Sequence, residues 1–315
     1  MQIKKIVPIL STGMSPSHRP TDFGHFIGQD GIKKTLGTAI SSAFKQGRPV
    51  GHILFSGPSG YGKTTLAQLV AQGVNSQLHS VTAYAISKPA EMIAVLNGLQ
   101  WGDVLFIDEI HRLKPAIEEM LYIAMEDCCI DMVMPDASAV KIPLQPFTLI
   151  GATTKMQLLS APLKNRFIYK LHLTDYTSAD VCKLIKQTLV QKGISLVDET
   201  LIKEISTYCT TTPREIVSTL IQLHDWMIVH AETLVLWKQQ REAFLHDARL
   251  VSGGLSPLHQ HYIAILSATE GRPVGIKTLS AKLGVDEQVI EHDLEPLLFK
   301  LGKIEKSSRG RYLTE

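Results

Sequence analysis

The sequence has little net charge, few cysteines and no long apolar run, and each of these features excludes a class of protein. Its 315 residues carry a formal net charge of +2, so overall charge does not favour nucleic acid or a membrane surface, and any basic binding surface must be local. No apolar stretch approaches the roughly 20 residues that a membrane helix needs, so we expect no membrane span. A signal peptide is not expected either, because the apolar stretch near the N-terminus is short and is interrupted by Pro8 and Ser11.

The cysteines and histidines do not predict a metal site. The four cysteines are Cys128, Cys129, Cys182 and Cys209. None has the spacing of zinc ligands, and the adjacent Cys128 and Cys129 are poor disulfide partners, so we expect free thiols and a cytoplasmic protein. His259 and His261 have no further ligand near them, and residues two apart point to different sides of a helix.

Residues 21–175 alternate between short apolar runs and helical patterns, after a flexible arm over residues 1–20. The stretches "HILFS", "DVLFIDE" and "FTLIGATT" are nearly continuous apolar runs, which is typical of strands covered on both faces. This alternation predicts an α/β domain with a parallel sheet between helices.

Residues 176–252 and 253–315 have a different character from the first domain. In the former range, apolar residues recur at helical spacing, which predicts a small all-helical domain. The stretch "SGGLSP" is a linker by composition. The remaining residues contain three helix candidates and a tail that fits a short hairpin, and this combination suggests a winged-helix domain.

The stretch "GPSGYGKTT" predicts a phosphate-binding loop. Gly57, Gly62, Lys63 and Thr64 satisfy the G-x-x-x-x-G-K-T spacing, in which backbone N–H groups surround phosphates at a helix N-terminus. The lysine then reaches the β- and γ-phosphates and the threonine hydroxyl binds Mg²⁺. A strand before the loop and a helix after it favour this interpretation over a chance glycine-rich turn. The predicted nucleotide contacts of the loop are Gly57, Gly60, Gly62, Lys63, Thr64 and Thr65.

An acidic pair follows the second apolar run. Asp108 and Glu109 end "VLFIDE", at the edge where parallel sheets bind ligands. We expect Asp108 to bind Mg²⁺ with Thr64, and Glu109 to orient the attacking water. Solvated acids end many strands, but an acidic pair after a phosphate-binding loop indicates a nucleoside triphosphatase and disfavours a kinase, which needs a separate acceptor pocket.

Three further stretches contain candidates for the catalytic site. Thr153 and Thr154 end the third run, where a hydroxyl could sense the γ-phosphate, although two β-formers at a strand end are also ordinary. Arg166 in "PLKNRF" is either a surface cation or an arginine supplied to a neighbouring subunit. Arg214 follows Pro213, which suits the first turn of a helix, and could reach the nucleotide from the helical domain.

Two stretches suggest partner surfaces. The stretch "CIDMVMPD" between two predicted strands fits a hairpin insertion, and the apolar Met132, Val133 and Met134 on it would form a partner surface if exposed. Residues 300–315 carry five Lys or Arg against two Glu. They form either a solvated tail or a phosphate-contacting patch on the wing, with Lys306, Arg309 and Arg311 as the candidate DNA contacts.

These motifs in this order resemble the RuvB family, the bacterial AAA+ motors that drive Holliday-junction branch migration. The resemblance extends from "RPTDFGHFIGQD" to "SSRGRYLTE" and is most specific in "GDVLFIDEIHRLKPAIEEMLYIAMED", "PFTLIGATT" and "EGRPVGIKTLSAKLG". It implies an AAA+ P-loop core, a helical lid, a winged-helix DNA-binding domain, ATP and Mg²⁺ as cofactors, and a homo-oligomer that forms a hexameric ring. The implied DNA is duplex or a four-way junction.

The resemblance also implies roles for single residues. It assigns Walker A to Lys63 and Thr64, Walker B to Asp108 and Glu109, sensor 1 to Thr154, the arginine finger to Arg166 and sensor 2 to Arg214. It places adenine contacts near Arg19, Pro20, Phe26, Ile27 and Tyr176, and it includes Pro213 in the nucleotide site. It matches the hairpin over residues 128–145 to the element that docks onto the junction-binding partner RuvA.

The sequence departs from the family pattern at several positions. Ser59 and Tyr61 replace the usual Pro and Leu of the loop, the hairpin lacks a glycine-rich segment, and "TTTPREIVSTLIQLH" replaces an arginine-rich lid stretch. Two alternatives to a motor therefore stay open. One is a switch ATPase of the clamp-loader or initiator kind that uses ATP to assemble something on DNA, and the other is a structural or adaptor subunit with weak catalysis.

Overall fold

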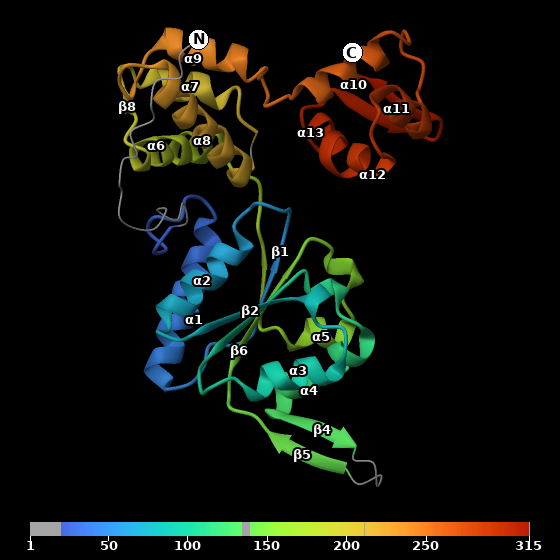
Figure 1. The fold of residues 1–315 in the computed structure, drawn as a ribbon. Coiled ribbons are helices and arrows are strands. Elements are labelled where there is room, and N and C mark those ends of the chain that lie inside the picture. Colours follow the sequence, from blue (N-terminus) through green and yellow to red (C-terminus); the bar gives the residue numbers. More distant parts are fainter. Residues whose placement is uncertain (1–19, 134–138, 211, 315) are drawn as a thin grey trace, which may run out of the picture.

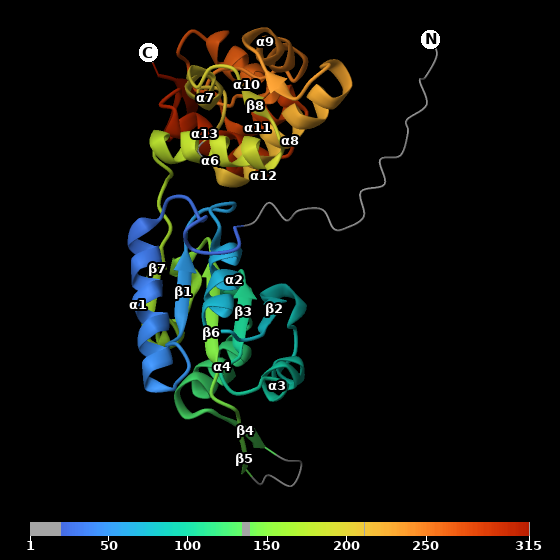
Figure 2. The same ribbon diagram turned by 90° about the vertical axis from the view of Figure 1, so that its left-hand side faces the viewer.

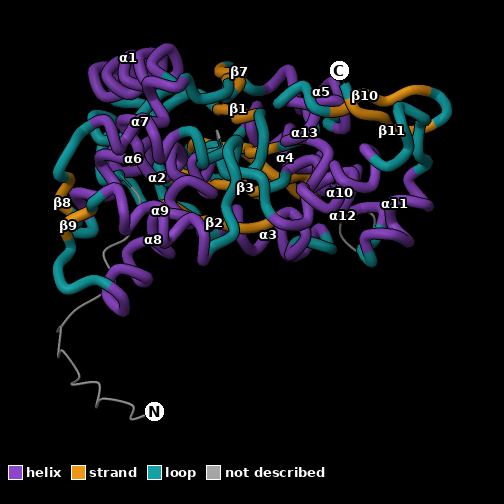
Figure 3. Tube along the Cα trace, turned by 90° about the horizontal axis from the view of Figure 1, so that it is seen from above, coloured by secondary structure: helices purple, strands orange, loops and turns teal. Residues whose placement is uncertain are grey.

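The computed structural model describes residues 20–133, 139–210 and 212–314, which form an α/β core, a helical lid and a winged-helix domain (Figure 1). Seen from above, the lid helices and the winged-helix domain occupy opposite sides over one end of the core (Figure 3). Within the described ranges, no helix combines the length and the apolar character needed to cross a membrane. The expected three-part fold is confirmed.

The core is built on a five-stranded parallel sheet with the order β2-β3-β6-β1-β7. Its strands are β1 (Ile53–Ser56), β2 (Leu78–Thr82), β3 (Val104–Asp108), β6 (Thr148–Thr153) and β7 (Tyr169–His172). The three central strands are buried along almost their whole length, as their continuous apolar runs predict. Because the strands are parallel, their carboxyl ends meet at one edge, and this edge carries the phosphate-binding loop and the acidic pair.

Helices cover both faces of this sheet because neighbouring strand residues point in opposite directions. On one face, α1 (Asp30–Gln46) and α2 (Lys63–Gly73) pack with Ile53 and Phe55. On the other face, Leu54 and Leu105 pack with α3 (Pro89–Asn97), α4 (Pro115–Asp127) and α5 (Ala161–Arg166). Single 3-10 turns, η1 (Ala83–Ala85), η2 (Ile110–Arg112) and η3 (Met156–Leu158), follow three of the strands.

The predicted hairpin insertion is present. The strands β4 (Cys129–Val133) and β5 (Ala139–Pro143) pair antiparallel and project from the end of the core that lies opposite the lid (Figures 1 and 2). Met134 and the side chains of Met132 and Val133 lie outside the described parts of the chain.

The lid contains α6 (Ser178–Gln191), α7 (Thr200–Ser206), α8 (Pro213–His230) and α9 (Lys238–Asp247). The expectation that it is entirely helical is wrong in one detail. The strands β8 (Ser195–Leu196) and β9 (Val235–Leu236) form a two-residue parallel pair, and the last helix therefore begins later than its apolar pattern suggests. The β-branched Val235 favours an extended backbone, and the N–H of Ser195 donates to the carbonyl of Leu234 at 2.9 Å.

The winged-helix domain has its own apolar core. It contains α10 (Pro257–Ser267), α11 (Ile276–Leu283) and the antiparallel hairpin of β10 (Ile304–Ser307) and β11 (Gly310–Leu313). The third predicted helix consists of three consecutive pieces, α12 (Glu287–Val289), the π-turn η4 (Ile290–Leu294) and α13 (Glu295–Lys300). Pro296 lacks an N–H group for the helical ladder, which explains why the regular α-helical pattern is interrupted just before it.

Candidate nucleotide-binding site

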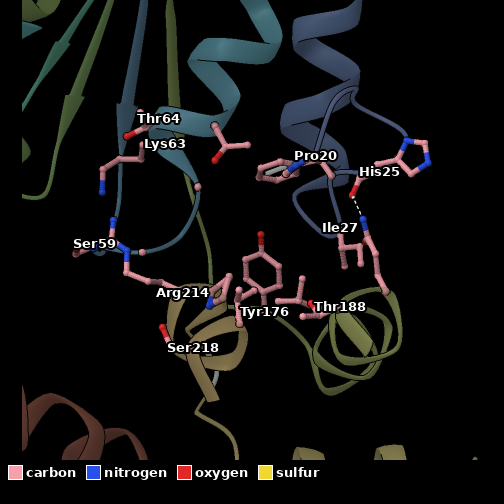
Figure 4. Close-up of a pocket in the computed structure, with 18 of the residues that line it drawn as sticks. Pro20, His25, Ile27, Ser59, Lys63, Thr64, Tyr176, Thr188, Arg214 and Ser218 are labelled. Carbon is pink, nitrogen blue, oxygen red and sulfur yellow. Dashed lines mark hydrogen bonds between the residues drawn. The ribbon is translucent and has the colours of Figure 1, made fainter. Parts of the chain in front are cut away.

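A cleft of about 320 Å³ lies between the phosphate-binding loop of the core and helices α6 and α8 of the lid (Figure 4). The predicted nucleotide-site residues that line it are Pro20, Phe26, Ile27, Gly60, Gly62, Lys63, Thr64, Thr65, Asp108, Glu109, Tyr176, Pro213 and Arg214. Of the other predicted contacts, Gly57 lies behind the loop against Leu173, and Arg19 lies outside the described residues. Segments far apart in the sequence therefore meet in one cleft.

The loop requires glycine at two positions beside the cleft. Gly60 and Gly62 have φ values of +81° and +100°, in the left-handed region that other residues rarely adopt. A Cβ atom at Gly62 would lie 2.8 Å from the Phe26 ring, and one at Gly60 would lie 2.8 Å from Thr212 of the lid. The loop leads into α2, whose N-terminus has no side-chain cap, so its first N–H groups are available to a phosphate.

Lys63 places a buried positive charge at this loop. Its side-chain ammonium donates to the carbonyl oxygens of Gly57 at 2.7 Å and Pro58 at 2.8 Å. Burial lowers the pKa of Lys63, and the nearby carboxylates of Glu109 and Asp108 oppose that shift. Neutral carbonyl oxygens hold the ammonium, so phosphate oxygens could replace them as acceptors without leaving an unpaired anion behind.

The residues that would hold Mg²⁺ fit a partial site. Thr64 offers a hydroxyl at the start of α2, and the Asp108 carboxylate accepts the N–H of Glu109 at 3.0 Å and retains further acceptor capacity. In the ranges that the structure describes, no group of three or more His, Cys, Asp or Glu side chains is arranged to hold a metal ion. Oxygen ligands suit Mg²⁺, which keeps several waters and takes further ligands from substrate phosphates.

Glu109 follows the carboxyl end of β3, and neighbouring side chains contact its carboxylate. Its φ of +50° turns the chain sharply before η2. One carboxylate oxygen, Oε2, accepts the hydroxyl of Thr154 at 3.2 Å and lies 3.1 Å from Nδ1 of His111. The same Nδ1 lies 2.9 Å from the hydroxyl of Thr153. The sequence motifs did not predict His111 as a site residue, although its position two residues after Glu109 was an available signal.

Arg214 reaches the loop from the lid. Helix α8 begins at Pro213, so Arg214 lies in its first turn and faces the core. Its guanidinium donates to the hydroxyl of Ser59 at 3.3 Å, and Figure 4 shows the two side chains side by side at the cleft. This contact joins the lid to a loop position at which the sequence departs from the family pattern.

The end of the cleft away from the phosphate-binding loop is lined by apolar side chains and by two polar side chains of α6. Phe26 and Tyr176 are buried, and burial raises the pKa of the Tyr176 hydroxyl. The side-chain amide of Gln187 donates to the carbonyl of His25 at 3.1 Å, and Thr188 also lines the cleft (Figure 4). The sequence motifs did not predict these two α6 residues, because one turn of an amphipathic helix carries no sequence signature of a ligand.

Arg166 does not line the cleft of its own chain. It ends α5, forms an ion pair with Glu126 of α4 and lies over the Tyr122 ring, 5.9 Å from its centroid. The side chain of Arg166 is 35% exposed. The structure therefore does not bring Arg166 together with the other predicted catalytic residues.

The wing holds the predicted DNA contacts in two different ways. Lys306 and Arg309 are exposed on the hairpin. Arg311 is 5% exposed, and it donates to Glu295 at 2.6 Å and to Glu291 at 3.0 Å. In this structure the guanidinium of Arg311 is therefore bound by the buried carboxylate of Glu295 and the exposed carboxylate of Glu291, both of its own domain, while its role as a DNA contact stays a prediction.

Comparison with known proteins gives concordant matches. The family described as the Holliday junction DNA helicase RuvB P-loop domain matches residues 18–173, and the RuvB C-terminal winged helix domain matches residues 252–315. The RuvB subunit of the Holliday junction branch migration complex of Campylobacter curvus is 39% identical over 302 residues, covering 95% of this chain and 89% of that protein. Its counterpart in Campylobacter jejuni subsp. jejuni serotype O:23/36 is 39% identical over 298 residues, covering 94% and 88%.

A solved structure agrees with these matches. The Thermotoga maritima RuvB Holliday junction branch migration motor superimposes with a TM-score of 0.80 at 33% sequence identity. The superposition covers 95% of this chain and 96% of that one. The superposition therefore includes all three parts of the fold.

Proposed function

The chain belongs to the RuvB family, and from that premise we propose that it is an ATP-driven motor that moves DNA through Holliday junctions. The observation that carries the proposal is the cleft itself. It gathers the buried ammonium of Lys63, the carboxylate of Glu109 and the lid guanidinium of Arg214 in a chain that also has a winged-helix domain. A nucleotide there would contact core and lid together, so its hydrolysis could change their relative position.

We infer the following roles within the cleft. The Lys63 ammonium and the first N–H groups of α2 bind the phosphates, and Thr64 and Asp108 hold Mg²⁺, which neutralises phosphate charge when bound. Glu109 polarises the attacking water, and Thr154 holds its carboxylate by a hydrogen bond. Arg214 adds positive charge from the lid, and Phe26, Ile27 and Tyr176 provide the apolar end for the base.

The exposed position of Arg166 supports a site that a second subunit completes. An arginine that lies outside its own cleft, with about a third of its side chain exposed, is available to a neighbouring copy. Arginines supplied in this way contribute about 10³–10⁵ in rate to phosphoryl transfer. We therefore propose a homo-oligomeric ring in which Arg166 serves the neighbouring nucleotide.

We propose that the winged helix contacts DNA phosphates through Lys306 and Arg309, and that the β4–β5 hairpin docks a RuvA-like partner. The two cations are exposed on the wing, and phosphate contacts suit a motor that must act on any sequence. The hairpin projects from the end of the core opposite the lid, where a partner could bind without covering the cleft (Figure 1).

The test is the rate of ATP hydrolysis per subunit, measured against protein concentration with and without duplex DNA. A motor completed in trans should show a rate that rises with both, and it should move a synthetic four-way junction. A flat, near-zero rate despite nucleotide binding would instead favour the adaptor alternative. ATP-dependent assembly without junction movement would favour a switch ATPase.

Glu109→Gln tests the assignment of the water-polarising group. The amide keeps the shape of the carboxylate and removes its charge, so we expect ATP to bind as before and hydrolysis to fall about 100-fold or more, in the range typical of a lost general base. The matched control is Glu119→Gln, a substitution on α4 outside the cleft lining. Normal hydrolysis by Glu109→Gln would show that another group polarises the water.

A further inference from the structure

His111 is a buried histidine in contact with the proposed water-polarising group. Its side chain is 5% exposed, and its Nδ1 atom lies 3.1 Å from Oε2 of Glu109 and 2.9 Å from the hydroxyl of Thr153. The Thr153 hydroxyl also accepts the N–H of Lys155 at 2.9 Å, which fixes it in place at the end of β6. The ring thus joins the ends of β3 and β6.

The Glu109 carboxylate indicates which ring nitrogen of His111 carries the hydrogen. An ionised Glu109 carboxylate has no proton to donate, so a 3.1 Å contact with Nδ1 is attractive when Nδ1 carries the hydrogen. Burial lowers the pKa of His111, which favours the neutral ring, and the contact with the Glu109 carboxylate favours the tautomer that carries the hydrogen on Nδ1. The left-handed turn at Glu109 then folds the chain so that the ring two residues later faces back onto the carboxylate.

We propose that His111 is a positioning residue that, together with Thr154, fixes the Glu109 carboxylate for water activation. Both groups contact the same oxygen, Oε2, so the other oxygen is left for the attacking water. This inference rests on the proposed ATPase function. Because a misplacement of about 1 Å can cost roughly 100-fold in rate, loss of one of the two contacts should lower kcat rather than nucleotide affinity.

The experiment compares three substitutions of His111 in the full chain. Asn places an amide nitrogen near the position of Nδ1, Gln places it near Nε2, and Phe retains only the ring volume. We expect His111→Phe and His111→Gln to lower kcat about 10-fold with an unchanged Kd for a fluorescent ATP analogue, and His111→Asn to recover most of the rate. His79→Phe, which removes a histidine outside the cleft lining, is the control that should leave kcat unchanged.

The outcomes separate this inference from the proposed function. If the wild-type protein does not hydrolyse ATP under any condition, the proposed function fails. If it does, and Asn and Gln give the same kcat, the positioning role of Nδ1 is overturned. Comparing these two polar substitutions keeps the test decisive even if the Phe variant does not fold.

A second contact joins the loop to the winged-helix domain. The hydroxyl of Tyr61, between Gly60 and Gly62, donates to Oδ1 of Asp175 at 2.6 Å, and the ammonium of Lys300 at the end of α13 lies 2.8 Å from Oδ2. The ammonium and the hydroxyl are themselves 3.5 Å apart. Asp175 lies in the segment that connects β7 of the core to α6 of the lid, so the Tyr61–Asp175–Lys300 bridge joins the core to the winged-helix domain beside that connection.

We also infer that this bridge couples phosphate binding at the loop to the position of the winged-helix domain, given the proposed ATP and DNA binding. Tyr61 is 4% exposed, so a change in the loop moves its hydroxyl together with the backbone. The Asp175 and Lys300 side chains are 57% and 34% exposed, and exposed ion pairs contribute little to stability. A weak contact of this kind can open and close without unfolding either domain.

The test is the ratio of two dissociation constants for duplex DNA, measured with and without a non-hydrolysable ATP analogue. We expect the analogue to change the Kd in the wild-type protein, and Lys300→Met to bring the ratio closer to one. The control Lys303→Met removes an exposed charge nearby and should leave the ratio unchanged, even if both constants rise. By linkage, the Kd for the analogue must respond to DNA by the same factor.

Each result has a defined meaning. A wild-type ratio of one, or an unchanged ratio in Lys300→Met, overturns the coupling. Absence of any DNA binding by the wild-type protein contradicts the proposed function itself.

Discussion

The nucleotide cleft and the wing both carry predicted anion-binding cations, but their partners differ. In the cleft, carbonyl oxygens hold Lys63 and the Ser59 hydroxyl accepts from Arg214, so both cations donate to neutral acceptors. On the wing, carboxylates bind Arg311 on two sides, and Lys306 lies 3.5 Å from Glu291. The positive charge is available in the cleft and largely compensated on the wing.

This difference indicates how each site can take up a phosphate. A phosphate that displaces a carbonyl or hydroxyl oxygen replaces a neutral acceptor with an anion, and the charge-assisted bond is stronger. A phosphate that displaces a carboxylate exchanges one anion for another and leaves a carboxylate unpaired, which is costly when that carboxylate is buried. Tight phosphate binding is therefore expected in the cleft and weak phosphate binding on the wing.

Lys63→Ala should give the largest effect, because it removes the available charge from the cleft. Each hydrogen bond to a charged group contributes roughly 1.5–3 kcal/mol, so we expect ATP affinity to fall about 100-fold or more. Titration of a fluorescent ATP analogue measures the loss. The control is Lys45→Ala, an exposed lysine in the last turn of α1, which should bind the analogue as the wild-type protein does. Equal affinity of the two variants would show that the cleft does not use this charge.

Arg311→Met should act on stability, because it removes the partner of a buried carboxylate. Glu295 has 4% of its side chain exposed, and it also accepts the Tyr262 hydroxyl at 3.1 Å. Loss of one partner of a buried ion pair costs about 3 kcal/mol or more, so hydrogen exchange within residues 253–314 of the full chain should become faster.

A second substitution checks this explanation. Adding Glu295→Gln to Arg311→Met removes the unpaired charge and should restore much of the protection against exchange. If Arg311→Met leaves the exchange unchanged and weakens DNA binding instead, Arg311 is a DNA contact after all.

The same comparison explains which features could be predicted from the sequence. The phosphate-binding loop and the acidic pair lie at strand ends, and the period and length of the apolar runs are local properties of the chain. The placement of Lys63, Asp108 and Glu109 in one cleft follows from the parallel sheet. A charged tail, in contrast, has no local feature that shows which of its cations face inward, and for this reason the burial of Arg311 could not be foreseen.

Other features depend on contacts between distant segments. The β8–β9 pair is two residues long on each side and forms because the lid helices bring those segments together. The Tyr61–Asp175–Lys300 bridge requires the relative positions of the core and the winged-helix domain, which no spacing in the sequence specifies. His111 could be noticed as a histidine near an acidic pair, but its role becomes visible only when the ends of β3 and β6 are placed side by side.

Arg309→Ala should give the smallest effect of these substitutions, a modest loss of affinity for DNA. It can be compared directly with Lys306→Ala on the same wing. No carboxylate of the described residues pairs with the Arg309 side chain, whereas Lys306 is already close to Glu291. Loss of one phosphate contact should raise the Kd for duplex DNA about threefold and reduce the slope of log Kd against log salt by about one. Lys306→Ala, measured in parallel by fluorescence anisotropy, should change both quantities less, because its carboxylate partner already competes with phosphate. A larger effect of Lys306→Ala than of Arg309→Ala would mean that compensation by a carboxylate does not determine which cations of the wing bind DNA.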